Sequence, residues 1–558
     1  MTNPLAELAR DYFDADCAAE PVYATANGIT GYEAEVPDPG RAAAREHRDT
    51  LGRLAARLDA IDAAGLTGED RITHAMLART IRDRRDALDD GITEVGVTAT
   101  TSGVFAEMIA ILPIANVADE ARAQAYLTRL SRLGGFFDGL GRRYLDAKAD
   151  GRFPTALGVR QTIAQLDGYL TNPLGRDPLL GIEAAGAADP AAWKSRAAEL
   201  VENVVRPAVA RYRTTLAEEL LPVGRSSDKV GVGNVPGGET AYRNAARAHT
   251  TTELTPEEMH ETGLALVAGL REEFAERGGR ALGVGDTAEV IRRLREDPAL
   301  RFETSAQIVD SVTGALRAAE EALPGWFRHY DIAPCVVGEM DPVEAADSVL
   351  GYYLAPAADG SRPGAHVVNT HRPDLRTRFE YEVLAFHESV PGHHLQFALA
   401  QALRGIPDFR RFAYVTAHSE GWGLYSERLS EEMGLYTSEL SRLGMVSFDA
   451  WRACRLVVDT GMHHYGWSRM RAVEYMRDNT ALSESNIANE VDRYIAWPGQ
   501  ALAYMVGRLS IDRARARARA ALGTAFDVRE FHHRVLAHGS IPLDILDDVI
   551  DRWTSGAR

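Results

Sequence analysis

The sequence predicts a mainly helical protein with little β structure. Of its 558 residues, 45% are hydrophobic and 25% are charged, which is usual for a folded chain that buries a sizeable core. Apolar residues recur every three or four positions in many segments, and one segment begins with a recognisable helix cap. Alternating, strand-like patterns are scarce. The length allows several ordinary domains or one large helical unit.

The clearest helical segment is 119–148, in which apolar side chains recur at helical spacing while Arg and Asp occupy the opposite face. Its apolar stripe consists of Leu127, Leu130, Leu133, Phe137, Leu140 and Tyr144. Similar amphipathic runs cover 44–64, 191–221, 256–279, 304–323, 443–459 and 468–477. These runs predict helices distributed over the whole chain.

One helix start is marked by its own chemistry. In "TTELTPEEMHETGL", Thr255 can cap the helix, Pro256 suits the first helical position and Glu258 completes a capping box. The best strand candidate is "GAHVVNT" at 364–370, just before a segment rich in histidine. The sequence therefore predicts a small β element at that point in a helical fold.

Pro and Gly are densest in "LLPVGRSSDKVGVGNVPGGET" at 220–240, which predicts a linker or a flexible loop. Its glycine spacing fits neither the dinucleotide nor the P-loop pattern, so we do not assign it to phosphate binding. We expect the chain to divide here into an N-terminal helical lobe, 1–222, and a C-terminal lobe, 223–558. One continuous domain is the alternative. We expect two lobes to flank a groove.

Composition excludes some partners. The formal net charge of −18 argues against nucleic acid and anionic membranes, both of which need a basic surface. Cys17, Cys335 and Cys454 are far apart and fit no disulfide or metal-ligand spacing, as is typical of a reducing compartment. We find no secretory signal and no apolar stretch long enough to span a membrane. A cytoplasmic protein is expected.

The segment "AFHESVPGHHLQ" at 385–396 resembles the H-E-x-x-H motif of zinc proteases, but only in its first half. His387 and Glu388 stand where the motif has its first metal ligand and its general base. A catalytic zinc takes three protein ligands, and a nearby carboxylate accepts a proton from water during attack on a carbonyl. The position of the second histidine, however, is taken by Pro391.

Two histidines could replace the missing second ligand. On a regular helix, His394 would lie about 20° from the face of His387, whereas His393 would lie about 120° away. Pro391 disfavours a regular helix here, because it removes a backbone hydrogen bond and clashes with the carbonyl of the preceding turn. A bulge or break in "SVPG" would carry His393 back to the metal. Spacing alone leaves both histidines open.

A third ligand is expected from "AYVTAHSEGWGLYSERLSEEMG" at 413–434. Glu420 is the leading candidate, because a helix in this segment could pack against the histidine helix. His418 is the alternative ligand. Glu427 lies on the same predicted face as Glu420 and suits a partner that orients a metal-bound histidine.

Longer motifs carry a family resemblance. "HESVPGHHLQ", "SEGWGLYSE", "VDTGMHHYGWS" at 458–468 and "DRYIAWPGQALAYMVGRLSI" at 492–511 resemble the bacterial domain-of-unknown-function 885 family. That family is similar to zinc peptidases such as thimet oligopeptidase, angiotensin-converting enzyme and thermostable carboxypeptidases. The resemblance implies a zincin-like helical fold with a deep groove. It also implies one zinc ion held by His387, His393 and Glu420, with Glu388 as the general base.

The resemblance extends to groups that would stabilise the negative oxygen of a tetrahedral intermediate. Related peptidases use downstream His and Tyr side chains, and His463 and Tyr504 occupy comparable places, with Tyr494 as the second choice. Asn369 is predicted on a strand edge that holds an extended substrate. Arg493 and Arg508 are candidates to bind a substrate carboxylate.

The predicted function is metal-dependent hydrolysis of peptide or peptide-like amide bonds, with short peptides or small amides as substrates. A first alternative keeps the metal but acts on an amide or ester of a small metabolite. A second alternative is a non-catalytic helical binding protein with structural histidines, against which the intact Glu388 argues. The oligomeric state, the natural substrate and the choice between endo- and exo-cleavage stay open.

Overall fold

The computed structural model describes residues 3–100, 102–115, 117–341, 345, 349–356 and 363–556. It is mainly helical and contains one small sheet, as the sequence predicts. The helices of the first half are α1 (Pro4–Ala19), α2 (Pro21–Ala26), α3 (Arg41–Asp59), α4 (Gly68–Asp90), α5 (Val104–Ile111), α6 (Glu120–Ala149), α7 (Ala156–Thr171), α8 (Pro190–Leu200), α9 (Arg206–Thr215), α10 (Gly238–Thr250) and α11 (Pro256–Leu282).

Those of the second half are α12 (Thr287–Glu296), α13 (Ser305–Trp326), α15 (Glu380–Glu388), α16 (His393–Ala402), α17 (Asp408–Arg411), α18 (Thr416–Glu432), α19 (Glu439–His463), α20 (Arg469–Asn479), α21 (Glu484–Ala496), α22 (Ala503–Leu522), α23 (Val528–Leu536) and α24 (Leu543–Ser555). Each amphipathic run identified in the sequence overlaps a helix. The run 44–64 extends past the end of α3 at Asp59, and the run 191–221 covers α8 and α9 with short π-helical stretches after each.

The helix starts follow from local side-chain chemistry. Asp119 accepts a hydrogen bond from the backbone N–H of Arg122 and caps α6. Thr255 and Glu258 form the predicted capping box at the start of α11, with Pro256 at the first helical position. Each such cap stabilises a helix end by about 1 kcal/mol, because it satisfies N–H groups that lack a partner within the helix.

The sheet has three short strands, β1 (Cys335–Glu339), β2 (Gly351–Leu354) and β3 (Gly364–Val368). Their order is β1-β3-β2, with β3 parallel to β1 and antiparallel to β2. In register, Val337 pairs with His366, and His366 with Tyr353. The central strand therefore ends shortly before α15, which confirms the predicted β element upstream of the histidine segment.

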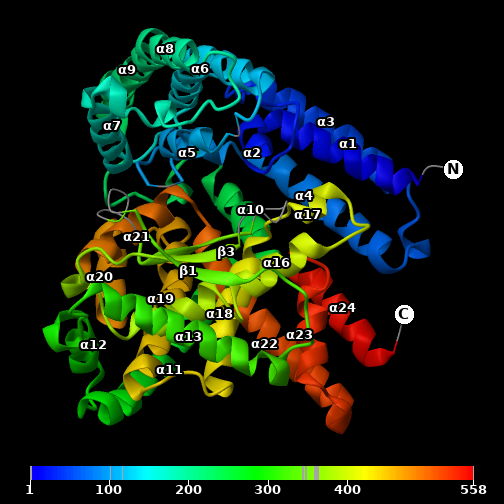
Figure 1. Cartoon of the computed structure of the whole chain (residues 1–558), viewed down its shortest axis with the longest axis vertical. Helices are drawn as coiled ribbons and strands as arrows, with labels where there is room; N and C mark the ends of the chain where they lie inside the picture. Colours follow the sequence, from blue (N-terminus) through cyan, green and yellow to red (C-terminus); the bar gives the residue numbers. More distant parts are fainter. Residues whose placement is uncertain are drawn as a thin grey trace.

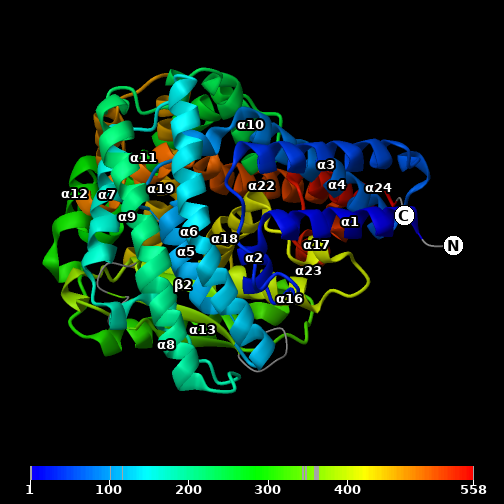
Figure 2. The ribbon, with the colours of Figure 1, turned by 90° about the horizontal axis from the view of Figure 1, so that it is seen from above.

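Buried apolar residues form two clusters among the described residues. One draws on Val22 and residues 97–220, which include α5 to α9. The other combines residues 5–95 with residues 230–550. The first helices of the chain thus share a core with the C-terminal half, and the cluster boundary differs from the predicted boundary at residue 222. Figures 1 and 2 show α6, α8 and α9 at one end of the molecule, with the sheet nearer its middle.

The segment 220–240 is not the flexible loop that its Gly and Pro content predicts. Val230, Val232 and Val235 are buried in the larger cluster. The backbone N–H of Val232 donates to Nδ1 of His463, and a Cβ added at Gly231 would meet the Met462 carbonyl oxygen at 1.8 Å. Glycine is needed here because the segment packs directly on the end of α19, so the flexible-loop prediction is wrong.

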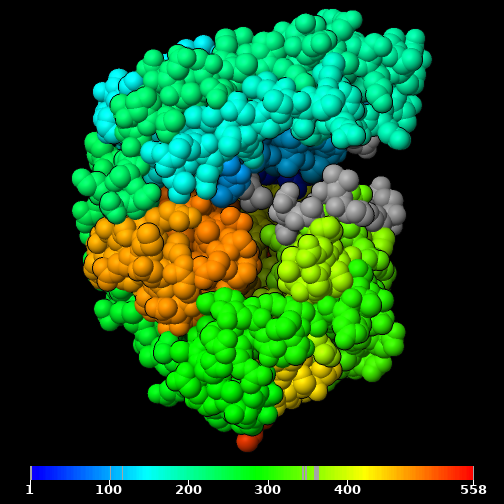
Figure 3. All heavy atoms as spheres, turned by 90° about the vertical axis from the view of Figure 1, so that its left-hand side faces the viewer, coloured from blue at the N-terminus to red at the C-terminus, as the bar shows by residue number. Residues whose placement is uncertain are grey.

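The centre of the larger cluster is α19, which is buried along most of its length. It packs against α11, α15 and α20, and it also contacts α18 and α22. In Figure 3 the molecular surface is hollowed between the N-terminal helices and the orange and yellow-green segments of the C-terminal half. Within the described residues, no helix is both long and apolar enough to cross a membrane.

Candidate metal centre

The helix that carries His387 stops where the sequence predicts a break. α15 ends at Glu388, and α16 begins at His393. A Cβ on Gly392 would meet the His387 carbonyl oxygen at 2.0 Å, so the turn closes too tightly for any other residue. The indole N–H of Trp422 donates to the Pro391 carbonyl oxygen at 2.9 Å and holds the turn against α18. The break is therefore a packed and hydrogen-bonded feature of the structure.

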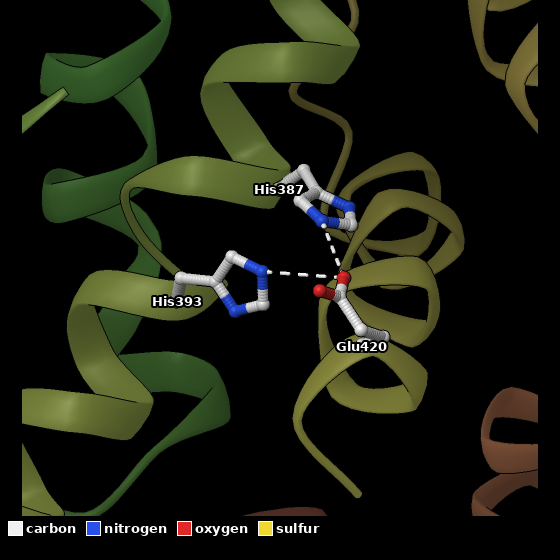
Figure 4. Close-up of side chains that lie close together, drawn as sticks. All are labelled: His387, His393 and Glu420. Atoms are coloured by element: carbon white, nitrogen blue, oxygen red, sulfur yellow. Dashed lines mark ion pairs between the residues drawn. The ribbon is translucent and has the colours of Figure 1, made fainter. Parts of the chain in front are cut away.

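This break brings His393, and not His394, to His387. Nε2 of His387 lies 3.5 Å from Oε2 of Glu420, and Nε2 of His393 lies 3.6 Å from the same oxygen. The two imidazoles come from successive helices, Glu420 comes from the facing α18, and all three point toward one another in Figure 4. One nitrogen or oxygen atom from each residue lies within 4.8 Å of the others, and all three residues form a buried group.

These separations fit a shared divalent ion. Zinc–nitrogen and zinc–oxygen bonds of about 2.0–2.2 Å at tetrahedral angles place neighbouring ligand atoms about 3.4 Å apart. The observed 3.5 and 3.6 Å are close to that value and long for a hydrogen bond. Although burial raises the pKa of Glu420, the two histidines outweigh it and hold that pKa well below its usual range. Two imidazoles and an ionised carboxylate are the donor set that zinc accepts.

Glu427 orients the first histidine. Its Oε1 lies 2.7 Å from Nδ1 of His387 and accepts the Nδ1 proton, which turns Nε2 toward Glu420. Glu427 is fully buried, in the place predicted for it, two turns beyond Glu420 on α18. A Cβ on Gly423 would meet the His387 ring at 2.6 Å, so this glycine makes room for the imidazole.

The two alternative histidine ligands are engaged elsewhere. Nε2 of His394 donates to the Ala333 carbonyl oxygen at 2.9 Å, and its Nδ1 accepts from the Tyr353 hydroxyl at 3.2 Å. Nε2 of His418 donates to the Val535 carbonyl oxygen at 3.0 Å. Burial lowers the pKa of His418 to about 4, so it stays neutral. His394 thus ties α16 to the loop at Ala333, and His418 ties α18 to α23, so both have structural positions.

Glu388, the predicted base, lies at the end of α15 and is only partly buried. Burial raises its pKa, and the charge of Glu420 acts in the same direction. His387, His393 and Arg452 oppose this rise. The direction of this shift is the one expected for a carboxyl group that acts as a general base.

Tyr504 reaches the site because α18 and α22 approach very closely. A Cβ on Gly421 would lie 2.5 Å from Cα of Gly507, so only glycines allow this crossing. Burial and the Glu420 carboxylate raise the pKa of Tyr504, whose ring is covered by the Arg455 guanidinium at 4.3 Å. The phenol therefore stays protonated beside Glu420 and can donate a hydrogen bond.

His463 does not share this position. Its Nδ1 accepts from the Val232 N–H at 3.0 Å, and its Nε2 donates to the Tyr494 carbonyl oxygen at 3.0 Å. Both ring nitrogens are thus used by backbone groups, and burial lowers the pKa of His463 to about 4. These contacts give His463 a structural role, in place of the predicted one at a developing negative oxygen.

The predicted substrate-binding residues are also held by protein groups. The amide nitrogen of Asn369 donates to the carbonyls of Ala345 and Val349 and does not face an open strand edge. Tyr494 donates its hydroxyl to Glu490, and Arg493 forms an ion pair with Glu490 at 3.1 Å.

Arg508 forms ion pairs with Asp449 at 3.1 Å and with Asp512 at 3.0 Å. Its guanidinium, like that of Arg493, is therefore neutralised by the protein. Neither arginine is free to bind a substrate carboxylate, because each already satisfies buried or half-buried acidic groups.

Two residues at the site were not predicted from the sequence. The Tyr414 hydroxyl donates to Oε1 of Glu420 at 2.6 Å, which leaves Oε2 for the histidines. Arg452, on α19, interacts electrostatically with Glu427, Glu420 and Glu388. The sequence feature that could have identified Tyr414 is its position six residues before Glu420, just ahead of the helix that carries this ligand.

Comparisons with known proteins match this chain over nearly its whole length. The profile of a family described as "Bacterial protein of unknown function (DUF885)" matches residues 21–550. A "putative lipoprotein" from Colwellia psychrerythraea has 25% identity and a TM-score of 0.91, with 100% of each chain covered. A "putative lipoprotein of unknown function" from Shewanella oneidensis has 16% identity and a TM-score of 0.77, covering 98% of this chain and 100% of that one. No protein of curated function matches the sequence.

Proposed function

Because the chain belongs to the bacterial DUF885 family of proteins of unknown function, we infer its activity from its own site and propose a zinc-dependent hydrolase of peptide or peptide-like amide bonds. The observation that carries the proposal is the convergence of His387, His393 and Glu420 on one point, next to Glu388. A distant relation to helical zinc peptidases is part of the same proposal.

The three residues would hold one zinc ion, with Glu427 and Tyr414 fixing the orientation of two of them. When bound, the ion supplies a Lewis acid that polarises a carbonyl group and lowers the pKa of water. The burial of the group supports this assignment, since charges act more strongly where water is excluded.

Glu388 and Tyr504 would move and hold protons during the reaction. The Glu388 carboxylate accepts a proton from the attacking water and passes it to the leaving amine, which its partial exposure and raised pKa favour. The Tyr504 phenol donates a hydrogen bond to the oxygen that becomes negative. Substrate would enter from the hollowed face in Figure 3, and two lobes around this groove are part of the proposal.

The test combines metal content with one substitution. Purified protein is expected to hold about one zinc per chain, and its hydrolysis of a panel of short peptides and acylated amines is expected to stop on chelation. Glu388→Gln should keep the zinc and lose about 10²- to 10⁴-fold in kcat, because only the proton transfer is removed. Glu432→Gln, at an exposed position on α18, should leave both unchanged.

A zinc content near zero after reconstitution would contradict the metal assignment. Full hydrolysis by Glu388→Gln of every amide that the unmodified protein cleaves would contradict the assignment of the base.

A further inference from the structure

Arg452 is a buried cation that lacks hydrogen-bond partners. It is 4% exposed, and its Nε and Nη1 atoms are buried without a hydrogen bond. Among the described residues, Arg452 forms no ion pair, whereas Arg455, one turn later on α19, donates to both Glu490 and Tyr494. A buried charge without a partner costs several kcal/mol, so a protein that keeps one usually uses it.

The Arg452 side chain is held by aromatic rings. Its guanidinium carbon lies 4.4 Å from the ring centre of Phe448 and 4.1 Å from that of Trp451. These cation–π contacts offset part of the cost of burial and fix the plane of the group. They use the faces of the guanidinium and leave its N–H edge free to donate.

Arg452 faces the candidate metal centre. α19 packs against α15, which carries His387 and Glu388, and against α18, which carries Glu420 and Glu427. The carboxylates of Glu427 and Glu420 act on Arg452, and Arg452 acts on Glu388, yet none of them forms an ion pair with it. The guanidinium therefore lies beside the site without being neutralised by it.

Charged groups of both signs surround Arg452. Arg455 and Arg493 share a single carboxylate, that of Glu490, and Arg455 repels Arg452 electrostatically. Arg452 is the member of this group that has no carboxylate partner among the described residues. A planar guanidinium binds a carboxylate through two parallel hydrogen bonds, a geometry that lysine cannot reproduce.

We propose that Arg452 binds a free carboxylate of the substrate, so that the site takes peptides or N-acyl amino acids whose scissile amide lies close to a free C-terminus. This inference rests on the proposed hydrolase function and narrows it to exo-cleavage or to short acylated amino acids. Arg452 takes the role that the sequence assigned to Arg493 and Arg508.

The test compares carboxylates with uncharged analogues of the same shape. The probes are a set of N-acetylated dipeptides and the same dipeptides as C-terminal amides, assayed for kcat/KM. The unmodified protein is expected to prefer the acids by about 10- to 100-fold, as charge-assisted hydrogen bonds of this type imply. Arg452→Met should abolish that preference, because KM should rise about 10- to 100-fold more for the acids than for the amides. Arg452→Lys should retain part of it.

Arg442→Met serves as the control, since Arg442 lies on the same helix and pairs with Glu439 away from the site. It should retain the full preference for acids. A purely structural Arg452 would lower hydrolysis of acids and amides equally, which would overturn the proposal. Equal hydrolysis of acids and amides by the unmodified protein would overturn it as well, while the hydrolase function would stand.

Failure of the hydrolase function is recognised separately. If neither probe is cleaved, calorimetry with N-acetylphenylalanine and its amide decides the role of Arg452. Binding of the acid over the amide, lost in Arg452→Met, would uphold carboxylate recognition without hydrolysis. Equal binding of the two would overturn it.

Discussion

The cluster of Val22 and residues 97–220 packs its helices through Leu, Phe and Tyr side chains, whereas the region from α15 to α22 buries histidines, carboxylates and arginines among its apolar residues. In the first region the few buried charges, such as Arg129, are satisfied locally: Arg129 donates to the backbone carbonyls of Tyr32 and Glu35. In the second, Arg452 and one oxygen of Glu427 have no hydrogen-bond partner.

The buried residues of the first region stabilise the fold, whereas the buried polar residues of the second are held in place at a cost in folding free energy. Apolar burial contributes roughly 25 cal/mol per Å², while an unsatisfied buried polar group costs about 1–3 kcal/mol. The polar region is therefore the part of the molecule where buried groups lower stability, as is expected of a functional site. Substitutions in the two regions should change different measured quantities.

The largest expected effect on stability is in the apolar cluster. Leu130→Ala should lower the free energy of unfolding by about 2–5 kcal/mol, because Leu130 is fully buried and the substitution leaves a cavity. Zinc content and hydrolysis per folded molecule should not change. Denaturant unfolding measures the loss, with Gln124→Ala on the exposed face of α6 as control. A Leu130→Ala variant with normal stability and lower zinc affinity would erase the contrast between the regions.

A smaller effect, on metal affinity, is expected at Glu427. Glu427→Gln should weaken zinc binding by about 10- to 100-fold, because the bond that fixes the ring and tautomer of His387 is weakened. Glu427→Gln should also lower the stability of the metal-free protein, because it weakens one side of a buried hydrogen-bonded pair with His387. Competition with a chelator measures the affinity, and Glu432→Gln on the same helix is the control. Unchanged zinc affinity in Glu427→Gln would show that the contact does not orient the ligand.

A third effect concerns the change of stability with pH. Burial raises the pKa of Asp459 from 3.8 to about 7, against the hydrogen bonds from Tyr242 and Gly499. The folded state therefore binds this proton more tightly than the unfolded state does. Its contribution to stability is complete below the ordinary pKa and is lost as the pH rises from about 4 to 7, at up to about 1.4 kcal/mol per pH unit.

Asp459→Asn should remove this slope. Urea unfolding of both proteins at pH 5, 6 and 7 measures it, and stability of the unmodified protein should fall more steeply than that of the variant. Asp478→Asn, at an exposed position of α20, should keep the slope of the unmodified protein. Parallel pH profiles for Asp459→Asn and the unmodified protein would contradict the assignment.

The sequence predicts the fold best where one face of a helix meets water. The stripe from Leu127 to Tyr144 defines α6 because its other face is charged. α15 offers no such contrast, since nearly every residue in it is buried. In the segment 220–240, the Gly and Pro content predicts flexibility, whereas the buried valines Val230, Val232 and Val235 pack the segment into the core.

The candidate site was predictable where residue type and order carry the chemistry. The sequence alone identifies Glu388 and the three candidate ligands by their type and order. The structure brings the three ligands, His387, His393 and Glu420, together. His463, Arg493 and Arg508 could not be judged in this way, because only three-dimensional contacts reveal which partners occupy them. Arg452 could not be predicted either, because no sequence motif shows that a buried side chain lacks a hydrogen-bond partner.

Because the helix is interrupted between α15 and α16, residues outside the ligand motif determine the spacing of the two histidine ligands. In an unbroken helix, the pitch alone sets the spacing of two ligands, and a five-residue pattern encodes it. Here the spacing depends on the Trp422–Pro391 hydrogen bond and on the close fit of Gly392, which lie outside such a pattern. A search for contiguous H-E-x-x-H would pass over this chain, and related proteins are better sought by the joint presence of "HESVPGHH" and "SEGWG".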